Sequence, residues 1–247
     1  MNNIEIEKLI DDLVSANLIL FNEGVLDAFG HVSVRNPNNR DHFFLARNMA
    51  PGLVTKGDIL EFNMEGEVVN DDSRKVYLER YIHSEIYRER DDVEAIVHSH
   101  SHSIVPFSVV KSAPLKPLCH MSGFIGTHVP IFEIRDVTGN DSNMLVTSKA
   151  LGASLTQSLG KNTLVLMRGH GSTVVAPSLK QAVYRAIYVE VNAQLQIQAS
   201  RLGPIEFLSE GEARATQITN EGQVDRPWNL WKSRAIKAQK YWLSEVS

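Results

Sequence analysis

Two histidines in the segment Val97-His98-Ser99-His100 have the spacing of residues that bind one cation. The run before them is rich in Ala, Ile and Val and predicts a strand over 93–97. Side chains two positions apart on a strand point to the same face, so His98 and His100 would project together. Neutral imidazole is the commonest metal-binding side chain and suits zinc, iron, nickel and copper. His102 joins the pair only if the extended conformation continues to that residue.

A metal centre that does chemistry needs a third protein ligand and an open position for substrate or water. The candidate is His170 in the turn Arg168-Gly169-His170-Gly171. Glycines on both sides permit backbone angles that aim the ring out of a hairpin tip. The local pattern leaves an alternative open, in which His98 and His100 form a solvated strand end and His170 is a surface turn residue.

Glu79 adds a carboxylate 19 residues before His98. Apolar residues recur at helical spacing over 77–90, which predicts a helix that contains Glu79. A helix that leads into a metal-bearing strand can place a carboxylate over the metal, where Glu79 would move protons beside a Lewis acid. The alternative is an exposed glutamate that pairs with His83, four residues further on, or with Lys75.

The elements that must position these side chains predict a single α/β domain over 1–204. Helices are expected over 5–23, 77–90 and 179–201, strands over 28–34, 43–46, 59–63, 93–97, 163–167 and 172–175, and a short strand followed by a helix over 144–159. Residues 106–117 are expected to be a proline-rich connection, and 205–247 a C-terminal extension. The extension carries Trp228 and Trp231, which need a surface to cover on this subunit or on a neighbour.

The composition excludes several classes of protein. The chain has 247 residues, 43% of them hydrophobic, with a net charge of −4, which fits a globular protein and excludes disordered and fibrous chains. Basic residues form no run, so we expect no nucleic-acid partner, and no stretch approaches the ~20 apolar residues that cross a membrane. The single Cys119 fits a reducing compartment, and residues 1–8 lack a signal-peptide pattern. We therefore expect a cytoplasmic protein without a membrane partner.

One ordered set of residues resembles the class II aldolase/adducin family over roughly residues 5–205. The set consists of Gly-X-X-Ser-Val-Arg at 30–35, Glu79, His98, His100 and His170. The resemblance implies a three-layer α/β/α sandwich around a largely antiparallel sheet. It also implies one divalent metal per subunit held by the three histidines, Glu79 as the acid/base carboxylate, and a cyclic homo-oligomer, a tetramer or a multiple of it. Zn²⁺ suits the imidazole ligands, and Mn²⁺ suits an oxygen-rich chelating substrate.

The sequence departs from the sugar-phosphate aldolases of this family at four sites. Gly30-His31 stands where those enzymes have Gly-Asn, Met49-Ala50 where they have Ser/Thr-Gly, and Tyr77-Leu78 where they have Ser-Ser. His120 replaces a tyrosine that acts as proton donor. The altered set is similar to a decarboxylase branch whose members act on hydroxylated aromatic or pyridine carboxylates, such as 3-hydroxy-2-methylpyridine-4,5-dicarboxylate and dihydroxyphthalate.

This resemblance predicts a lyase, namely a metal-dependent decarboxylase of a hydroxylated aromatic or pyridine (di)carboxylate. It would act through a metal-stabilised enolate or phenolate, with Glu79 in proton transfer. Arg47 would clamp a second carboxylate, Tyr77 would line a pocket for a flat ring, and His31 and His120 would donate hydrogen bonds to the substrate. The alternatives are an aldolase or epimerase that acts on a sugar or sugar phosphate, and a non-enzymatic scaffold like adducin.

Overall fold

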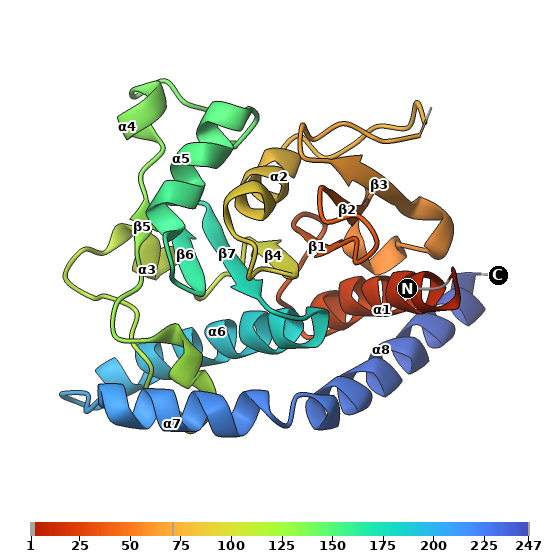
Figure 1. Cartoon of the computed structure of the whole chain (residues 1–247). Helices are drawn as coiled ribbons and strands as arrows, with labels where there is room; N and C mark the ends of the chain where they lie inside the picture. Colours follow the sequence, from red (N-terminus) through yellow and green to blue (C-terminus); the bar gives the residue numbers. More distant parts are fainter. Residues whose placement is uncertain (1–2, 71, 247) are drawn as a thin grey trace.

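A seven-stranded sheet lies at the centre of the computed structural model, which describes residues 3–70 and 72–246 (Figure 1). The strand order is β3–β2–β1–β4–β7–β6–β5, and every neighbouring pair is antiparallel except β5 and β6. The strands are β1 (His31–Arg35), β2 (His42–Ala46), β3 (Ile59–Asn63), β4 (Ala95–Ser99), β5 (Ile131–Phe132), β6 (Leu164–Met167) and β7 (Gly171–Ala176).

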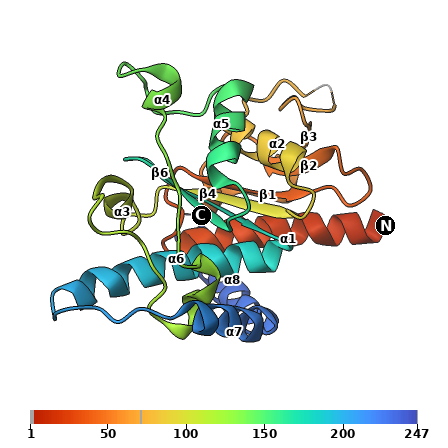
Figure 2. The ribbon, with the colours of Figure 1, turned by 60° about the vertical axis from the view of Figure 1, so that its left-hand side comes forward.

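Helices cover both faces of this sheet, which gives the three layers that Figures 1 and 2 show from two directions. One face packs against α2 (Arg80–Glu89) and α5 (Lys149–Leu159), and the other against α1 (Asn3–Asn22) and α6 (Leu179–Ser200). A separate apolar core fills the space on each side. The predicted three-layer α/β/α sandwich around a largely antiparallel sheet is therefore confirmed.

The alternation of side chains along the central strands decides which residues face which core. On β4, Val97 lies in the core under α1 and α6, whereas Ile96 lies in the core under α2 and α5. Because strand side chains alternate with a period of two, His98 points to the same face as Ile96. On β1, Val32 belongs to the core under α1 and α6, so its neighbour His31 also faces α2. The sheet thus directs the polar side chains of β1 and β4 towards α2.

Several short elements were missed or misplaced in the sequence-based expectations. The predicted connection 106–117 begins with a helix, α3 (Val105–Val109), and the strand expected at the start of 144–159 is absent from the described coordinates of that segment. The remaining short elements are η1 (Pro51–Leu53), η2 (Lys56–Asp58), η3 (His120–Ile125) and α4 (Arg135–Thr138). One or two turns of helix carry little propensity signal, so tertiary contacts determine them.

The C-terminal segment forms two helices, α7 (Glu210–Glu221) and α8 (Asp225–Val246). Figure 1 shows α8 running beside α1, where Lys232 Nζ lies 2.8 Å from Asp12 Oδ1. Trp228 and Trp231 are 2% and 7% exposed and belong to the core that α1 and α6 share. The two tryptophans therefore cover this subunit's own core. Within the described residues, no helix is both long and apolar enough to cross a membrane.

Candidate metal centre

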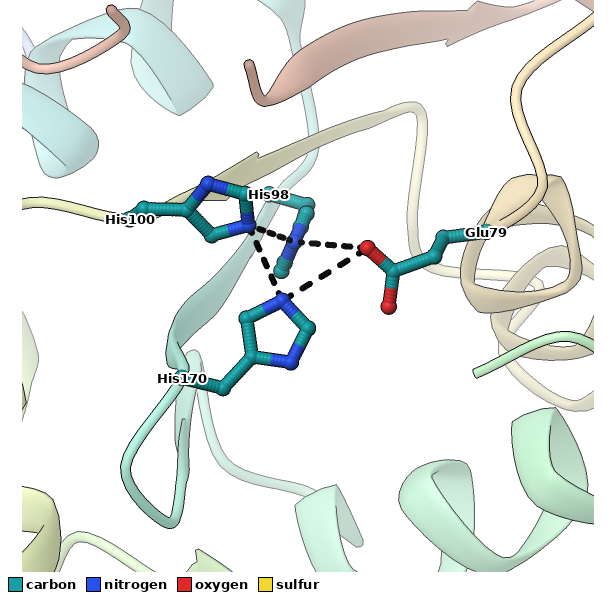
Figure 3. Close-up of side chains that lie close together, drawn as sticks. All are labelled: Glu79, His98, His100 and His170. Carbon is teal, nitrogen blue, oxygen red and sulfur yellow. Dashed lines mark hydrogen bonds and ion pairs between the residues drawn. The ribbon is translucent and has the colours of Figure 1, made fainter. Parts of the chain in front are cut away.

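Four side chains from three separate segments converge at one end of the central strands (Figure 3). His98 is on β4, His100 follows that strand, His170 is in the turn between β6 and β7, and Glu79 is the N-cap residue of α2. The Nε2 atom of His100 lies 3.1 Å from that of His98 and 2.9 Å from that of His170. Glu79 Oε2 lies 3.5 Å from Nε2 of both His98 and His170.

The strand register explains why His170 reaches the other two histidines. β4 and β7 pair antiparallel with Ser99 opposite Ser172, so the turn before β7 lies next to the end of β4. The two glycines that flank His170 are required for different structural reasons. Gly169 has a φ of +64°, which favours glycine, whereas a Cβ on Gly171 would collide with the Ser99 carbonyl oxygen. The expectation of special backbone angles thus holds for Gly169, and Gly171 is needed for close approach.

The hydrogen bonds of the outer ring nitrogens show that this donor set fits a divalent cation. His98 Nδ1 lies 3.2 Å from the Ser172 carbonyl oxygen, and His170 Nδ1 lies 2.9 Å from that of Met144. A carbonyl only accepts, so each Nδ1 donates, and in its neutral form each of these two rings directs its Nε2 lone pair at the cluster. A cation at the centre of the cluster would then have two ligand atoms already in place. Such outer hydrogen bonds are the usual support of a metal-binding histidine.

Burial and neighbouring charge set the protonation states in the cluster. Burial alone would raise the pKa of Glu79, but hydrogen bonds from His170 and His98 outweigh it and lower that pKa below its usual value. Burial, together with the neighbouring His98 and His170, lowers the pKa of His100 to about 4. The other carboxylate oxygen, Glu79 Oε1, accepts a hydrogen bond of 2.9 Å from the Val146 backbone N–H. Burial opposes the charged form of His170, but the hydrogen bond to Glu79 outweighs it and raises the pKa of His170. The cluster therefore combines three imidazoles with a fixed carboxylate.

A cavity of about 350 Å³ opens beside the cluster. Glu79 and His100 form part of its wall, and most of the remainder is apolar. No lysine, arginine, serine or threonine is among the described residues that line it. The other lining residues are Ala28, Phe29, Gly30, His31, Asn48, Met49, Ala50, Tyr77, Leu78 and Leu145.

The structure places two of the four expected substrate-binding residues at this cavity. His31 and Tyr77 both line it, with ring centroids 4.7 Å apart. The Tyr77 hydroxyl donates a 2.5 Å hydrogen bond to the Met49 carbonyl, so the aromatic ring forms the wall. Burial raises the pKa of Tyr77 to about 12.

Arg47 and His120 lie outside the lining in this subunit. Arg47 Nε donates a 2.7 Å hydrogen bond to Asp58 Oδ1, which holds the guanidinium away from the cavity. His120 is exposed at the start of η3, where its backbone carbonyl accepts a hydrogen bond from Asn220. His102 is also exposed and separate from the cluster.

Glu79 and His83 do not pair as the alternative assignment supposed. The helix begins at Arg80, after Glu79, because residues 78–79 form the turn that leads into it. Glu79 is buried against His98 and His170, and His83 instead contacts His31. Burial lowers the pKa of His83 to about 3, which keeps this ring neutral.

Sequence reasoning did not find the hydrogen-bonded residues behind His31, namely His83, Ser33 and Tyr87. Two periodicities could have indicated them. Ser33 is two positions after His31 on a strand and faces the same side, and Tyr87 is four positions after His83 on a helix.

Comparison with known proteins agrees with this fold and site. Residues 11–197 match the class II aldolase and adducin N-terminal domain. Decarboxylase tropJ of Talaromyces stipitatus is 39% identical over 241 residues, covering 88% of this chain and 90% of that protein. The 3,4-dihydroxyphthalate decarboxylase of Arthrobacter keyseri is 28% identical over 200 residues, covering 75% and 76%. The structure of an L-fuculose 1-phosphate aldolase from Glaciozyma antarctica superposes with a TM-score of 0.72 at 25% identity, covering 99% of this chain and 94% of that one.

The chain belongs to the class II aldolase and adducin family, and it is a lyase. Class II aldolases use a divalent metal, and the cluster of Glu79, His98, His100 and His170 is a possible site for one. The named decarboxylases among its relatives support decarboxylase activity within this family.

Proposed function

We propose that this protein is a metal-dependent decarboxylase of a hydroxylated aromatic or heteroaromatic carboxylate. The observation that carries the proposal is the apolar, partly aromatic cavity directly beside a cluster of three histidines and one glutamate. A planar ring fits between apolar walls, whereas a phosphate needs several cations, hydroxyls or amide donors, and Asn48 is the one side-chain amide among the described residues that line the cavity. The two decarboxylases similar to this chain support the same reaction, and one of them is named for an aromatic diacid.

Under this proposal His98, His100 and His170 hold the metal through Nε2, and Glu79 transfers protons. When bound, a divalent cation supplies a Lewis acid beside the oxygen atoms of the substrate. The carbonyls of Ser172 and Met144 hold two of the rings in the ligating tautomer. The Val146 N–H fixes one oxygen of Glu79, which leaves Oε2 directed at the histidines. The imidazole ligands favour Zn²⁺, and a chelating oxygen substrate favours Mn²⁺.

Glu79 moves one proton between two atoms of the substrate. As a carboxylate it accepts the proton of the ring hydroxyl next to the reacting carboxylate. It then delivers that proton to the ring carbon that carries the carboxylate. The carbon–carbon bond breaks, CO2 leaves, and the bonding pair restores the aromatic ring. The negative charge stays on the former hydroxyl oxygen, which takes a proton from solvent.

We also propose that the protein is a cytoplasmic homo-oligomer, a tetramer or a multiple of it. Phe29 and Leu78 support the oligomer, because they line the cavity yet are 67% and 60% exposed. Large apolar side chains at a cavity mouth are typical of surfaces that another subunit covers. The free Cys119 fits a reducing compartment. Light scattering on the purified protein measures the oligomer mass directly.

The decisive experiment offers a panel of ortho-hydroxy aromatic acids, including 3,4-dihydroxyphthalate, to the protein loaded with Zn²⁺ or Mn²⁺. The expected result is CO2 release from at least one acid and no aldehyde release from L-fuculose 1-phosphate. Aldehyde release from the sugar phosphate without any CO2 release would instead favour the aldolase, the second candidate supported by the structural neighbour.

A further inference from the structure

A second histidine pair lies behind the cavity and is distinct from the four-residue cluster. His31 Nδ1 on β1 lies 2.6 Å from His83 Nε2 on α2. The two side chains are 3% and 0% exposed. His31 lines the cavity, and its ring centroid is 5.0 Å from that of His98. The pair therefore connects the cavity wall to the buried face of α2.

The hydrogen bonds continue from this pair to a buried tyrosine. His83 Nδ1 lies 2.6 Å from Ser33 Oγ, and Ser33 Oγ lies 2.8 Å from the Tyr87 hydroxyl. Ser33 and Tyr87 are 0% and 1% exposed. Within the described residues, the Tyr87 hydroxyl has no other hydrogen-bond partner, so the chain of hydrogen bonds ends there.

Tyr87, at the end of this series of hydrogen bonds, determines which group donates in each of them. A phenol has one proton to donate, and Ser33 Oγ is the acceptor it has. If Ser33 donated to Tyr87 instead, the tyrosine proton would be buried without an acceptor, which is the costlier arrangement. Tyr87 therefore donates to Ser33, Ser33 donates to His83 Nδ1, and His83 Nε2–H donates to His31 Nδ1. In this arrangement Nδ1 of each ring accepts a hydrogen bond and so carries no proton, which leaves one proton on each ring.

This direction leaves the single proton of His31 on Nε2. No protein partner for that atom is found within residues 3–70 and 72–246, and the ring lines the cavity. We propose that Tyr87, Ser33 and His83 are positioning residues that hold His31 protonated at Nε2, so that His31 donates a hydrogen bond to an acceptor oxygen of the substrate. The substrate-binding half of this inference rests on the proposed function, since a carboxylate or phenolate oxygen is the acceptor.

The tautomer is measured without any substrate. The Zn²⁺-loaded protein is labelled with ¹⁵N-histidine, and the two ring nitrogens of His31 and His83 are assigned from the spectra of His31→Gln and His83→Gln. We expect both rings to be protonated at Nε2 and unprotonated at Nδ1. A proton on Nδ1 of His31 would overturn the proposal. In Tyr87→Phe, we expect the Nδ1 signal of His83 to shift, because its serine donor loses the phenol.

The proposed hydrogen bond from His31 to the substrate is tested by steady-state kinetics with an ortho-hydroxy aromatic acid that the protein decarboxylates. His31→Leu should raise KM or lower kcat by about 10-fold or more, the size of a lost hydrogen bond to a charged oxygen. His31→Gln, which keeps an N–H donor, should recover part of the loss. Tyr87→Phe and Ser33→Ala should each lower kcat/KM by about 2- to 10-fold.

Tyr184→Phe is the matched control, because it removes a buried phenol that donates to the Met121 carbonyl on the other side of the sheet. Equal losses in Tyr184→Phe and Tyr87→Phe would show a general packing effect and overturn the positioning role. The expected tautomer together with an unchanged KM and kcat in His31→Leu would overturn the substrate contact. If no acid is decarboxylated, the proposed function fails while the ¹⁵N spectra still decide the tautomer.

Discussion

His100 and His170 are 70 residues apart in sequence, yet their Nε2 atoms lie 2.9 Å from one another. Neither residue belongs to a strand, and each is positioned by the strand next to it. The pairing of β4 with β7 brings the two segments together, and the Met144 carbonyl orients one ring. When both rings present their Nε2 lone pairs, a divalent cation held between them would relieve the repulsion of those lone pairs, so the folded sheet places two ligand atoms where one cation can bind both.

Removing one histidine of this cluster should remove the metal. We expect the purified protein to hold close to one divalent metal per chain, and His170→Ala to lose most of it. Metal binding stabilises the folded state by mass action, about 3–4 kcal/mol at metal concentrations 100- to 1,000-fold above Kd. A chelator should therefore lower the Tm of the unsubstituted protein and leave the Tm of His170→Ala nearly unchanged. Elemental analysis and thermal unfolding measure both effects.

His102→Ala is the control for that experiment, because His102 is exposed and lies outside the cluster. It should keep its metal and its response to the chelator. Full metal retention in His170→Ala would contradict the ligand assignment.

Replacing Glu79 by glutamine separates proton transfer from metal binding. Glu79→Gln keeps an oxygen that can accept from the Val146 N–H, so the side chain should stay in place. We expect this variant to retain its metal and to lose about 100-fold or more in kcat, the size of a missing general acid–base group. Steady-state CO2 release and metal analysis on one sample measure both quantities.

Glu94→Gln serves as the comparison, since Glu94 forms a partly exposed ion pair with Arg40 and lies outside the cluster. Its kcat should equal that of the unsubstituted protein. Unchanged turnover in Glu79→Gln would remove the proton-transfer role from Glu79.

Local patterns in the sequence predicted those features that depend on neighbouring residues. The alternation at His98 and His100 and the glycines beside His170 are local signals, and the three histidines and Glu79 lie together in the structure. The long helix after Ser178 was also predicted, because its serine cap is present and its apolar face is regular.

Features that depend on contacts between distant segments could not be predicted. Arg47 has an acid partner, Asp58, on the short helix η2, and no pattern shows which of several nearby acids it selects. The contact between His31 and His83 joins residues 52 apart. β5 is two residues long and is defined by its pairing with β6, and two residues are too few to show the alternation that predicts a strand.

Arg47 was expected to bind a second carboxylate of the substrate, and its position in the structure predicts that it does not. Since its guanidinium pairs with Asp58 outside the cavity lining, Arg47→Ala should change the KM for an aromatic diacid by less than about threefold. The ion pair is partly exposed, so its loss should cost at most about 1 kcal/mol of stability. A tenfold rise in KM would restore Arg47 as the clamp for the second carboxylate.

The last prediction concerns the C-terminal helices. Trp228 is 2% exposed in the core that α1 and α6 share, so Trp228→Ala should lower the free energy of unfolding by about 3–5 kcal/mol. For a chain of this length, that loss corresponds to a drop in Tm of roughly 6–20 °C. Leu230→Ala on the same helix is the matched control, because Leu230 is 58% exposed and should change Tm little. Equal, small shifts in both variants would mean that α8 contributes little to the core.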